Sequence, residues 1–208
     1  MAEPSDEGTQ TAGSLIDDWL PEYQARDVAR TNVRGSPESA FAAAREMDFF
    51  DDSVIRGLFS VRRGPGLAMD WYRGVKRASA EHSRFSLDTL AQSDSGFVLL
   101  AEDDDATSGR REVVLGAVGR FWAPKTTFEA VSAEAFRAYD VGGQARAVIG
   151  LRAEPAEEGR SRVTFEVRVA PIGRRARLSF RVYWLGVGKL SHVVRQRALR
   201  RLKEELED

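Results

Sequence analysis

The sequence predicts an α+β fold in which an antiparallel sheet packs against a long C-terminal helix. Four β-rich segments follow one another between residues 96 and 170, and the apolar period changes from strand-like to helical after Pro171. The chain has 208 residues, of which 42% are hydrophobic and 30% charged, which suits one domain. At this length roughly 70% of the unfolded surface can be buried. We therefore expect no metal or disulfide to be needed for folding.

The first twenty residues are expected to be a disordered tail and a short brace. Residues Met1–Gly13 are polar and offer almost nothing to bury, which is typical of disorder. Ser14 is expected to cap a short amphipathic turn that Pro21 stops. Its apolar residues are Leu15, Ile16, Trp19 and Leu20. The folded domain is then expected over residues 21–208.

A strand is predicted over Tyr23–Arg34, and a helix begins directly after it. Ser36-Pro37-Glu38 places a capping hydroxyl, a proline at the first helical position and an acid near the positive end of the helix dipole. This is the clearest helix start in the sequence. The inward side of the helix is expected to carry Phe41, Ala44 and Met47.

The next forty residues contain fewer regular signals. A second short helix is expected over Asp51–Phe59. A long surface connection is expected over Arg62–Ser83, because this segment contains Gly64-Pro65-Gly66 and no sustained period. Ordered loops of this length often form lids or binding edges, which makes Trp71 and Tyr72 candidates for a binding edge.

The four β-rich segments are predicted to form a meander. They are Gly96–Glu102, Arg111–Trp122, Gln144–Ala153 and Arg160–Ala170. Their polar links, Asp103–Gly109 and Glu157–Gly159, are short enough for antiparallel hairpins. The fourth segment alternates strictly between apolar and polar residues, so one face is expected to be dry and the other wet. Between the second and third segments, Phe128–Asp140 is expected to hold a short strand near its start and a kink around Ser132-Ala133-Glu134.

A long helix is predicted from Pro171 to the end of the chain. We expect its apolar side to pack on the sheet, and the Gly186-Val187-Gly188 step to bend it. The residues assigned to that side are Leu178, Val182, Leu185, Val193, Val194, Leu199 and Leu202.

This order of elements resembles the START-like helix-grip superfamily, also called the SRPBCC or polyketide cyclase-like group. The resemblance covers about Pro21–Asp208. Val28–Met47 looks like the opening strand and helix of the family. Gly116–Pro124, with Gly119-Arg120-Phe121-Trp122, and the helix start Phe180-Arg181-Val182-Tyr183-Trp184 look like a bacterial branch of it. These patterns are more specific for a fold than for an activity.

The resemblance implies a curved sheet wrapped around the last helix, with a cavity between them for a lipid, a polyketide or another apolar ligand. Such a pocket binds by removing ligand surface from water. The residues expected to line it are Leu115, Ala117, Phe121, Ile149, Leu151, Phe165, Val167, Tyr183 and Leu190. Periodicity reports a buried face but not a hollow one, so the alternative is that these residues pack a filled core.

Metal and cofactor chemistry finds little support in the sequence. The chain has no cysteine and only two histidines, His82 and His192, without a metal-binding spacing, so we expect no metal and no cofactor. The run Trp184–Ser191 fails as a phosphate loop, because Tyr183 stands at the first glycine position and Leu190 replaces the required Ser or Thr. The acidic run Glu102–Asp105 lacks the spacing of a calcium loop and is expected to be a solvated hairpin tip.

The formal net charge of −1 gives no reason to expect a nucleic-acid partner. The 27 arginines against 4 lysines are explained by a GC-rich genome. No signal peptide and no apolar run of about 18 residues is present, so the sequence predicts a cytoplasmic protein. The basic segment Arg195–Lys203 could contact a membrane surface, although the acids that directly follow it, and the helix dipole, give a structural reason for its charge.

Three functions are compatible with the sequence. The first is binding or carriage of an apolar small molecule. The second is a cyclase, aromatase or dehydratase, which requires a titratable side chain in the cavity; the candidates are His192, Tyr183, Tyr139 and Asp140. The third is a protein-interaction module, which a large exposed apolar patch would favour. Alternation places Arg120 and Arg146 on the outward side of their strands and not in the cavity. The sequence leaves the oligomeric state open.

Overall fold

The computed structural model describes residues 13–47, 86–92, 96–105, 107–123 and 127–207. Several sequence expectations lie outside these ranges. They are the disordered tail up to residue 12, the short helix Asp51–Phe59, the connection that contains Trp71 and Tyr72, and His82.

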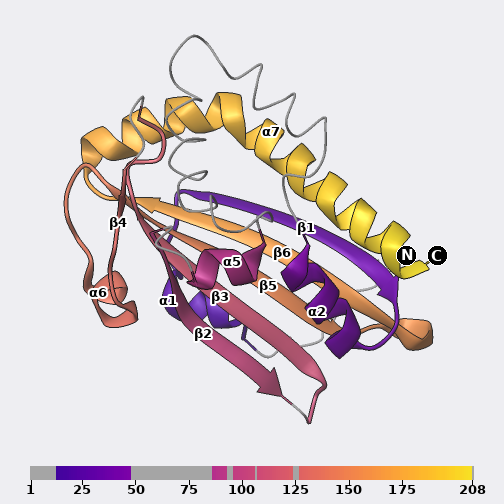
Figure 1. Cartoon of the computed structure of the whole chain (residues 1–208). Helices are drawn as coiled ribbons and strands as arrows, with labels where there is room; N and C mark the ends of the chain where they lie inside the picture. The colour runs from indigo at the N-terminus through magenta and orange to yellow at the C-terminus, as the bar shows by residue number, and fades with distance from the viewer. Residues whose placement is uncertain (1–12, 48–85, 93–95, 106, 124–126, 208) are drawn as a thin grey trace, which may run out of the picture.

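The described residues form one curved, six-stranded antiparallel sheet (Figure 1). Its strands are β1 (Ala25–Arg34), β2 (Phe97–Asp105), β3 (Arg110–Gly119), β4 (Phe128–Glu129), β5 (Ala145–Pro155) and β6 (Arg160–Pro171). The order across the sheet is β1-β6-β5-β3-β2, with β4 paired to the end of β3. The predicted hairpins are therefore confirmed, and β1 completes the sheet by pairing with the last strand.

Five α-helices are described: α1 (Leu15–Trp19), α2 (Pro37–Glu46), α5 (Leu87–Gln92), α6 (Ala133–Ala138) and α7 (Arg174–Glu207). Helices α2, α5 and α7 cover one side of the sheet, which we call the α7 face, while α1 and α6 cover the other, the α1 face (Figure 1). Helix α7 runs mainly along β1 and β6 and changes direction about midway (Figure 1). The Ser36 hydroxyl caps α2 as predicted, accepting a hydrogen bond of 3.2 Å from Ser39 N.

Three elements differ from the sequence expectation. The acidic residues after Glu102 continue β2 to Asp105, because arginines on β3 lie opposite them: Asp104 pairs with Arg111. Strand β3 ends at Gly119, so Arg120, Phe121 and Trp122 lie beyond it. The expected kink after Phe128 is helix α6, which Ser132 caps by accepting from Ala135 N at 3.2 Å. Helix α5 was not predicted.

The face expected to be wet is not open to solvent. Helix α1 packs on it, and Ile16 and Leu20 are each only 1% exposed beside Val114, Val148 and Phe136. Charged residues of the sheet are buried on this side as well, including Glu112, Glu166 and Arg168. Alternation reported correctly that these residues share a face, but it could not reveal that a helix covers them.

The predicted apolar side of α7 is wrong in its first half. Leu178, Val182 and Leu185 are 66%, 67% and 74% exposed, and Val193 is 43% exposed, while Ala176 and Phe180 are buried. At 3.6 residues per turn, Leu202 lies about 120° around the helix from Leu178 but only about 40° from Phe180. The buried side of α7 therefore joins Ala176 and Phe180 to Ala198, Leu199 and Leu202.

Candidate functional site

The centre of the α7 face is a row of residues that crosses five strands. Leu99, Leu115, Ile149, Val167 and Asp27 are successive cross-strand partners on β2, β3, β5, β6 and β1. Leu115 is buried, but Ile149 and Val167 are only half-buried, although β5 and β6 are interior strands. Their neighbours one step along the same face, Leu151 and Phe165, are buried.

The structure places six of the nine predicted lining residues around this row and two more in a neighbouring cluster. Leu115, Ala117, Leu151 and Phe165 are buried, and Ile149 and Val167 are half-buried beside them. Phe121 and Tyr183 join a neighbouring aromatic cluster around Phe180, with ring centroids 6.4 and 6.0 Å from it. The side chain of Leu190 lies outside the described part of the chain.

A polar cluster stands at the β1 end of the row. Asp27 is 8% exposed and accepts from two side chains of α7: its Oδ1 lies 2.7 Å from His192 Nδ1, and its Oδ2 contacts a terminal nitrogen of Arg195. Gln196 Nε2 lies 2.9 Å from His192 Nε2 on the other side of the ring. Strand β1 and one turn of α7 thus hold the cluster together.

These partners assign the proton on the imidazole. A carboxylate oxygen only accepts hydrogen bonds, so His192 Nδ1 carries the hydrogen and Nε2 is an acceptor for the Gln196 amide. The side chain of His192 is 41% exposed, whereas those of Asp27 and Arg195 are 8% and 10% exposed. Of Asp27, His192 and Arg195, the imidazole is therefore the side chain that solvent reaches most readily.

Arg195 brings a buried positive charge to the cluster. Burial lowers the pKa of Arg195 to about 10, which leaves the guanidinium charged at neutral pH. Its Nε is buried and has no hydrogen-bond partner in the described ranges. Buried polar groups are nearly always paired, so this nitrogen is an unused donor beside Asp27. An anionic or carbonyl group could accept from it.

The other candidate acid-base residues lie elsewhere. Tyr139 packs with the α1-face cluster and donates to Glu129 Oε2 at 3.2 Å, and its pKa is raised, chiefly by burial. Asp140 borders a surface hollow of about 380 Å³ together with Arg146. Arg120 is exposed, and the guanidinium of Arg146 donates to Arg137 O at 3.0 Å, so neither reaches the row.

A second hollow, of about 550 Å³, opens beside the first half of α7. It is lined by Gln24, Arg174, Arg177, Leu178, Phe180, Arg181, Trp184 and Leu185. None of the nine predicted residues lines either hollow. Sequence reasoning missed this one because it placed Leu178 and Leu185 against the sheet.

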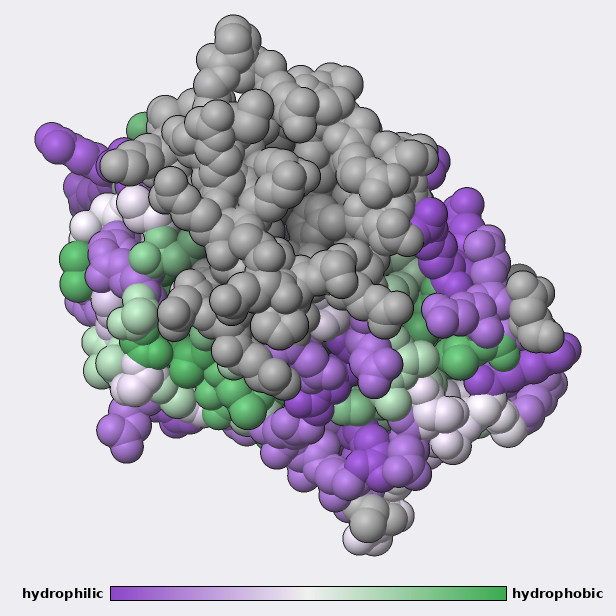
Figure 2. Space-filling view, in the orientation of Figure 1, coloured by the Kyte–Doolittle hydropathy of each residue, from purple (hydrophilic) through white to green (hydrophobic). Residues whose placement is uncertain are grey.

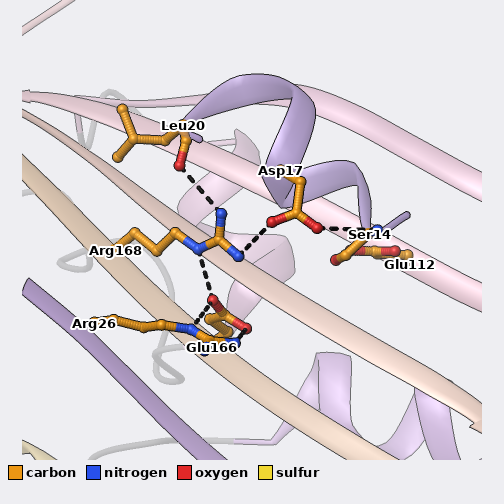
Figure 3. A network of polar contacts seen from close by, with 7 residues as sticks. All are labelled: Ser14, Asp17, Leu20, Arg26, Glu112, Glu166 and Arg168. Carbon is orange, nitrogen blue, oxygen red and sulfur yellow. Dashed lines mark hydrogen bonds and ion pairs between the residues drawn. The ribbon is translucent and has the colours of Figure 1, made fainter. Parts of the chain in front are cut away.

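The α1 face carries an ion network that fixes α1 to the sheet (Figure 3). Arg168 donates to Glu166 at 2.6 Å, to Asp17 at 2.6 Å and to Leu20 O at 3.1 Å. Arg26 binds the same Glu166 carboxylate with contacts of 2.7 and 3.0 Å. Burial opposes the charge on Glu166, but the hydrogen bonds from Arg26 and Arg168 outweigh it and lower its pKa. The charged groups of Arg26, Glu166, Arg168 and Asp17 bind one another, so this network stabilises the fold.

The surface seen from the side of Figure 1 is mixed. Hydrophobic residues gather on the left of the view, where Figure 1 places β2, β4 and α6, and hydrophilic residues gather at the lower tip, where β2 ends and β3 begins (Figure 2). No helix in the described part of the chain is long and apolar enough to cross a membrane.

No protein-family model and no curated protein matches the chain. Two solved structures are similar in backbone trace. The crystal structure of a hypothetical protein from Helicobacter pylori has a TM-score of 0.43 and 12% identity over 96% of this chain and 98% of that one. A putative uncharacterized protein from Bacillus thuringiensis has a TM-score of 0.29 and 12% identity over 88% and 100%. At these TM-scores neither likeness carries an argument about family, ligand or activity.

Proposed function

We propose that the protein binds an apolar or amphiphilic small molecule on the α7 face, between the sheet and α7. The observation that carries the proposal is the half-burial of Ile149 and Val167 in the two interior strands, β5 and β6. Apolar side chains at the centre of a sheet are normally packed to the density of a crystal. Leaving these two partly open costs stability that an apolar ligand recovers.

Aromatic side chains around the row support an apolar ligand. Phe97 flanks it on β2, and Phe121, Tyr183 and Trp184 stand beside Phe180, all half-buried. Aromatic rings offer large contact areas with few rotamers to fix, which suits a site that closes on a ligand. The START-like order of elements also implies a ligand between the sheet and the last helix.

The polar cluster suggests where a polar end of the ligand would lie. His192 presents its exposed edge next to Asp27, and Asp27 is the cross-strand partner of Val167. A carboxylate or carbonyl at the β1 end of the row would find the Nε of Arg195, unpartnered among the described residues, as its donor. The ligand class is therefore an apolar body with one acceptor group.

Binding is tested with 1-anilinonaphthalene-8-sulfonate as a fluorescent probe and with palmitate as a competitor, followed by thermal shift. We expect the probe fluorescence to saturate, and palmitate to lower it by displacing the probe. Ligand at roughly 100-fold its Kd should stabilise the native state by about 2.7 kcal/mol. Ile149→Phe fills the open side of the row and should weaken palmitate binding by at least about tenfold, whereas Val141→Phe, at an exposed position away from the row, should leave it unchanged.

The ligand-free melting temperature of each variant separates loss of the site from loss of the fold. Val167→Phe provides a second filling variant if Ile149→Phe does not fold. Unchanged palmitate affinity in a folded filling variant contradicts the proposed position. The absence of any saturable binding to the wild-type protein contradicts the proposal itself.

The hydrogen bond between His192 and Asp27 favours a second candidate, an enzyme that moves a proton at the same site. Asp27 orients the ring through Nδ1, and Nε2 is the basic atom that a substrate would meet once it displaces the exposed Gln196 amide. A dehydratase would take the α-proton of a 3-hydroxyacyl thioester at His192 Nε2 and return it to the β-hydroxyl, which leaves as water as the Cα–Cβ double bond forms. Incubation with a 3-hydroxyacyl N-acetylcysteamine thioester should then give a product lighter by one water, and His192→Gln should abolish the loss. No loss of water with the wild-type protein contradicts this candidate for that substrate class.

A further inference from the structure

The first half of α7 carries an apolar stripe that no described element covers. Leu178, Val182 and Leu185, which we call the α7 stripe, are 66%, 67% and 74% exposed. Their spacing places them within an arc of about 60° on the helix surface. The opposite side of the same turns holds Ala176 and Phe180, both buried against the sheet. Three adjacent and largely exposed aliphatic side chains on one helix are a mark of an interaction surface.

Arginines border the stripe on both sides. At about 100° per residue, Arg174, Arg177 and Arg181 lie along one edge and Arg175 along the other. All four are exposed, and Arg174, Arg175 and Arg181 have no carboxylate within ion-pair distance in the described ranges. Residues 174–181, which carry the start of the stripe, contain four arginines and no Asp or Glu. The charge of this surface therefore favours an anionic partner.

The hollow of about 550 Å³ lies along the same edge of the stripe. Arg174, Arg177 and Arg181 stand at its border with Gln24, while Leu178, Leu185 and Trp184 supply apolar wall. Gln24 Nε2 donates to Arg177 O at 2.8 Å, which ties the start of β1 to this turn of α7. A guanidinium rim beside an apolar wall matches a phosphate headgroup attached to an acyl chain.

We propose that the α7 stripe and its arginine border dock on an anionic phospholipid bilayer. Aliphatic residues would enter the headgroup boundary while the arginines bind lipid phosphates, which is how an interfacial amphipathic helix binds. A second copy of the chain fits less well, because symmetric pairing of this surface would bring arginines against arginines. This membrane contact lies in the first half of α7 and not at Arg195–Lys203, the basic segment that the sequence offered as a possible contact. The two proposals share Trp184, but none of the residues varied below belongs to the proposed ligand site.

Vesicle flotation of the full chain tests the proposal. We expect binding to vesicles of phosphatidylcholine mixed with phosphatidylglycerol, weak binding to phosphatidylcholine alone, and release as the salt concentration rises. Replacing Arg174 and Arg181 with Gln should weaken binding roughly 10- to 30-fold. Arg200→Gln with Arg201→Gln removes the same charge at two exposed positions near the end of α7 and should change it much less.

A second pair of variants tests the aliphatic residues of the α7 stripe. Leu178→Gln with Leu185→Gln should reduce flotation without changing net charge, whereas Val141→Gln, at another exposed apolar position, should not. Equal loss in the Arg174/Arg181 and Arg200/Arg201 variants would show attraction by total charge alone and overturn the assignment to the stripe. Complete release by inorganic phosphate at constant ionic strength would indicate a free-anion site, which also overturns it. Self-association of the wild-type chain that the Leu178/Leu185 variant abolishes would overturn the assignment as well.

Discussion

Arg168→Ala should destabilise the fold strongly, because this side chain joins α1 to the sheet. Arg168 is 4% exposed and donates to Glu166, Asp17 and Leu20 O. Its guanidinium also lies 4.8 Å from the ring centre of Tyr23. Removing one partner of a buried ion pair costs about 3–5 kcal/mol, because the other charge stays buried without it. Glu166 keeps Arg26, so we expect the lower end, about 3 kcal/mol.

Arg26→Ala is the matched control. It removes the other guanidinium from the same carboxylate, but the side chain of Arg26 is 42% exposed. Glu166 would keep Arg168, so the cost should stay at or below about 1 kcal/mol, the range of solvent-screened pairs. Urea unfolding followed by circular dichroism measures both values. Equal costs for the two variants, or less than about 1 kcal/mol for Arg168→Ala, would refute the account of how α1 is held.

Three further predictions concern the same fold. Folding lowers the pKa of Glu166, so its contribution to the free energy of unfolding is present above its unfolded pKa and is lost as the pH falls through its folded pKa. Glu166→Gln should therefore flatten the acid side of a profile of unfolding free energy against pH, measured by urea unfolding. Phe180→Ala should cost about 3–5 kcal/mol in the same assay, since Phe180 is 1% exposed at the centre of the aromatic cluster. Gly119→Ala should lower the melting temperature, because the new Cβ would lie 2.0 Å from Thr127 O at the β3–β4 junction, and overpacking of this kind costs about 1–3 kcal/mol. A melting temperature equal to that of the wild type would show that the junction adjusts freely.

Local signals in the sequence predicted the elements whose causes are local. Ser36-Pro37-Glu38 contains its own cap and dipole partner, and α2 begins there. The alternation along Arg160–Ala170 separated the two faces of β6 correctly, because Phe165 packs on the α7 face and Arg168 binds α1 on the other. Such features depend on neighbours within a few residues, so one sequence is enough to find them.

Features that depend on distant partners were missed. Asp103–Asp105 looked like a loop because acids are poor strand formers, and only the arginines opposite on β3 explain the strand. The pairing of Asp27 with His192 joins residues that are 165 positions apart, and no local sequence pattern around either residue predicts it. The apolar residues of α7 were all assigned to one side of the helix. The helical period instead divides them into a buried side and an exposed stripe.

Photo-crosslinking can locate the proposed apolar ligand on the α7 face over β5 and β6. Palmitate carrying a diazirine near the middle of its chain is bound and irradiated, and the labelled peptides are identified by mass spectrometry. We expect label on the peptides that contain Ile149 and Val167, and less label when unmodified palmitate competes. Label confined to α1 and α6, or label that palmitate does not reduce, would contradict it.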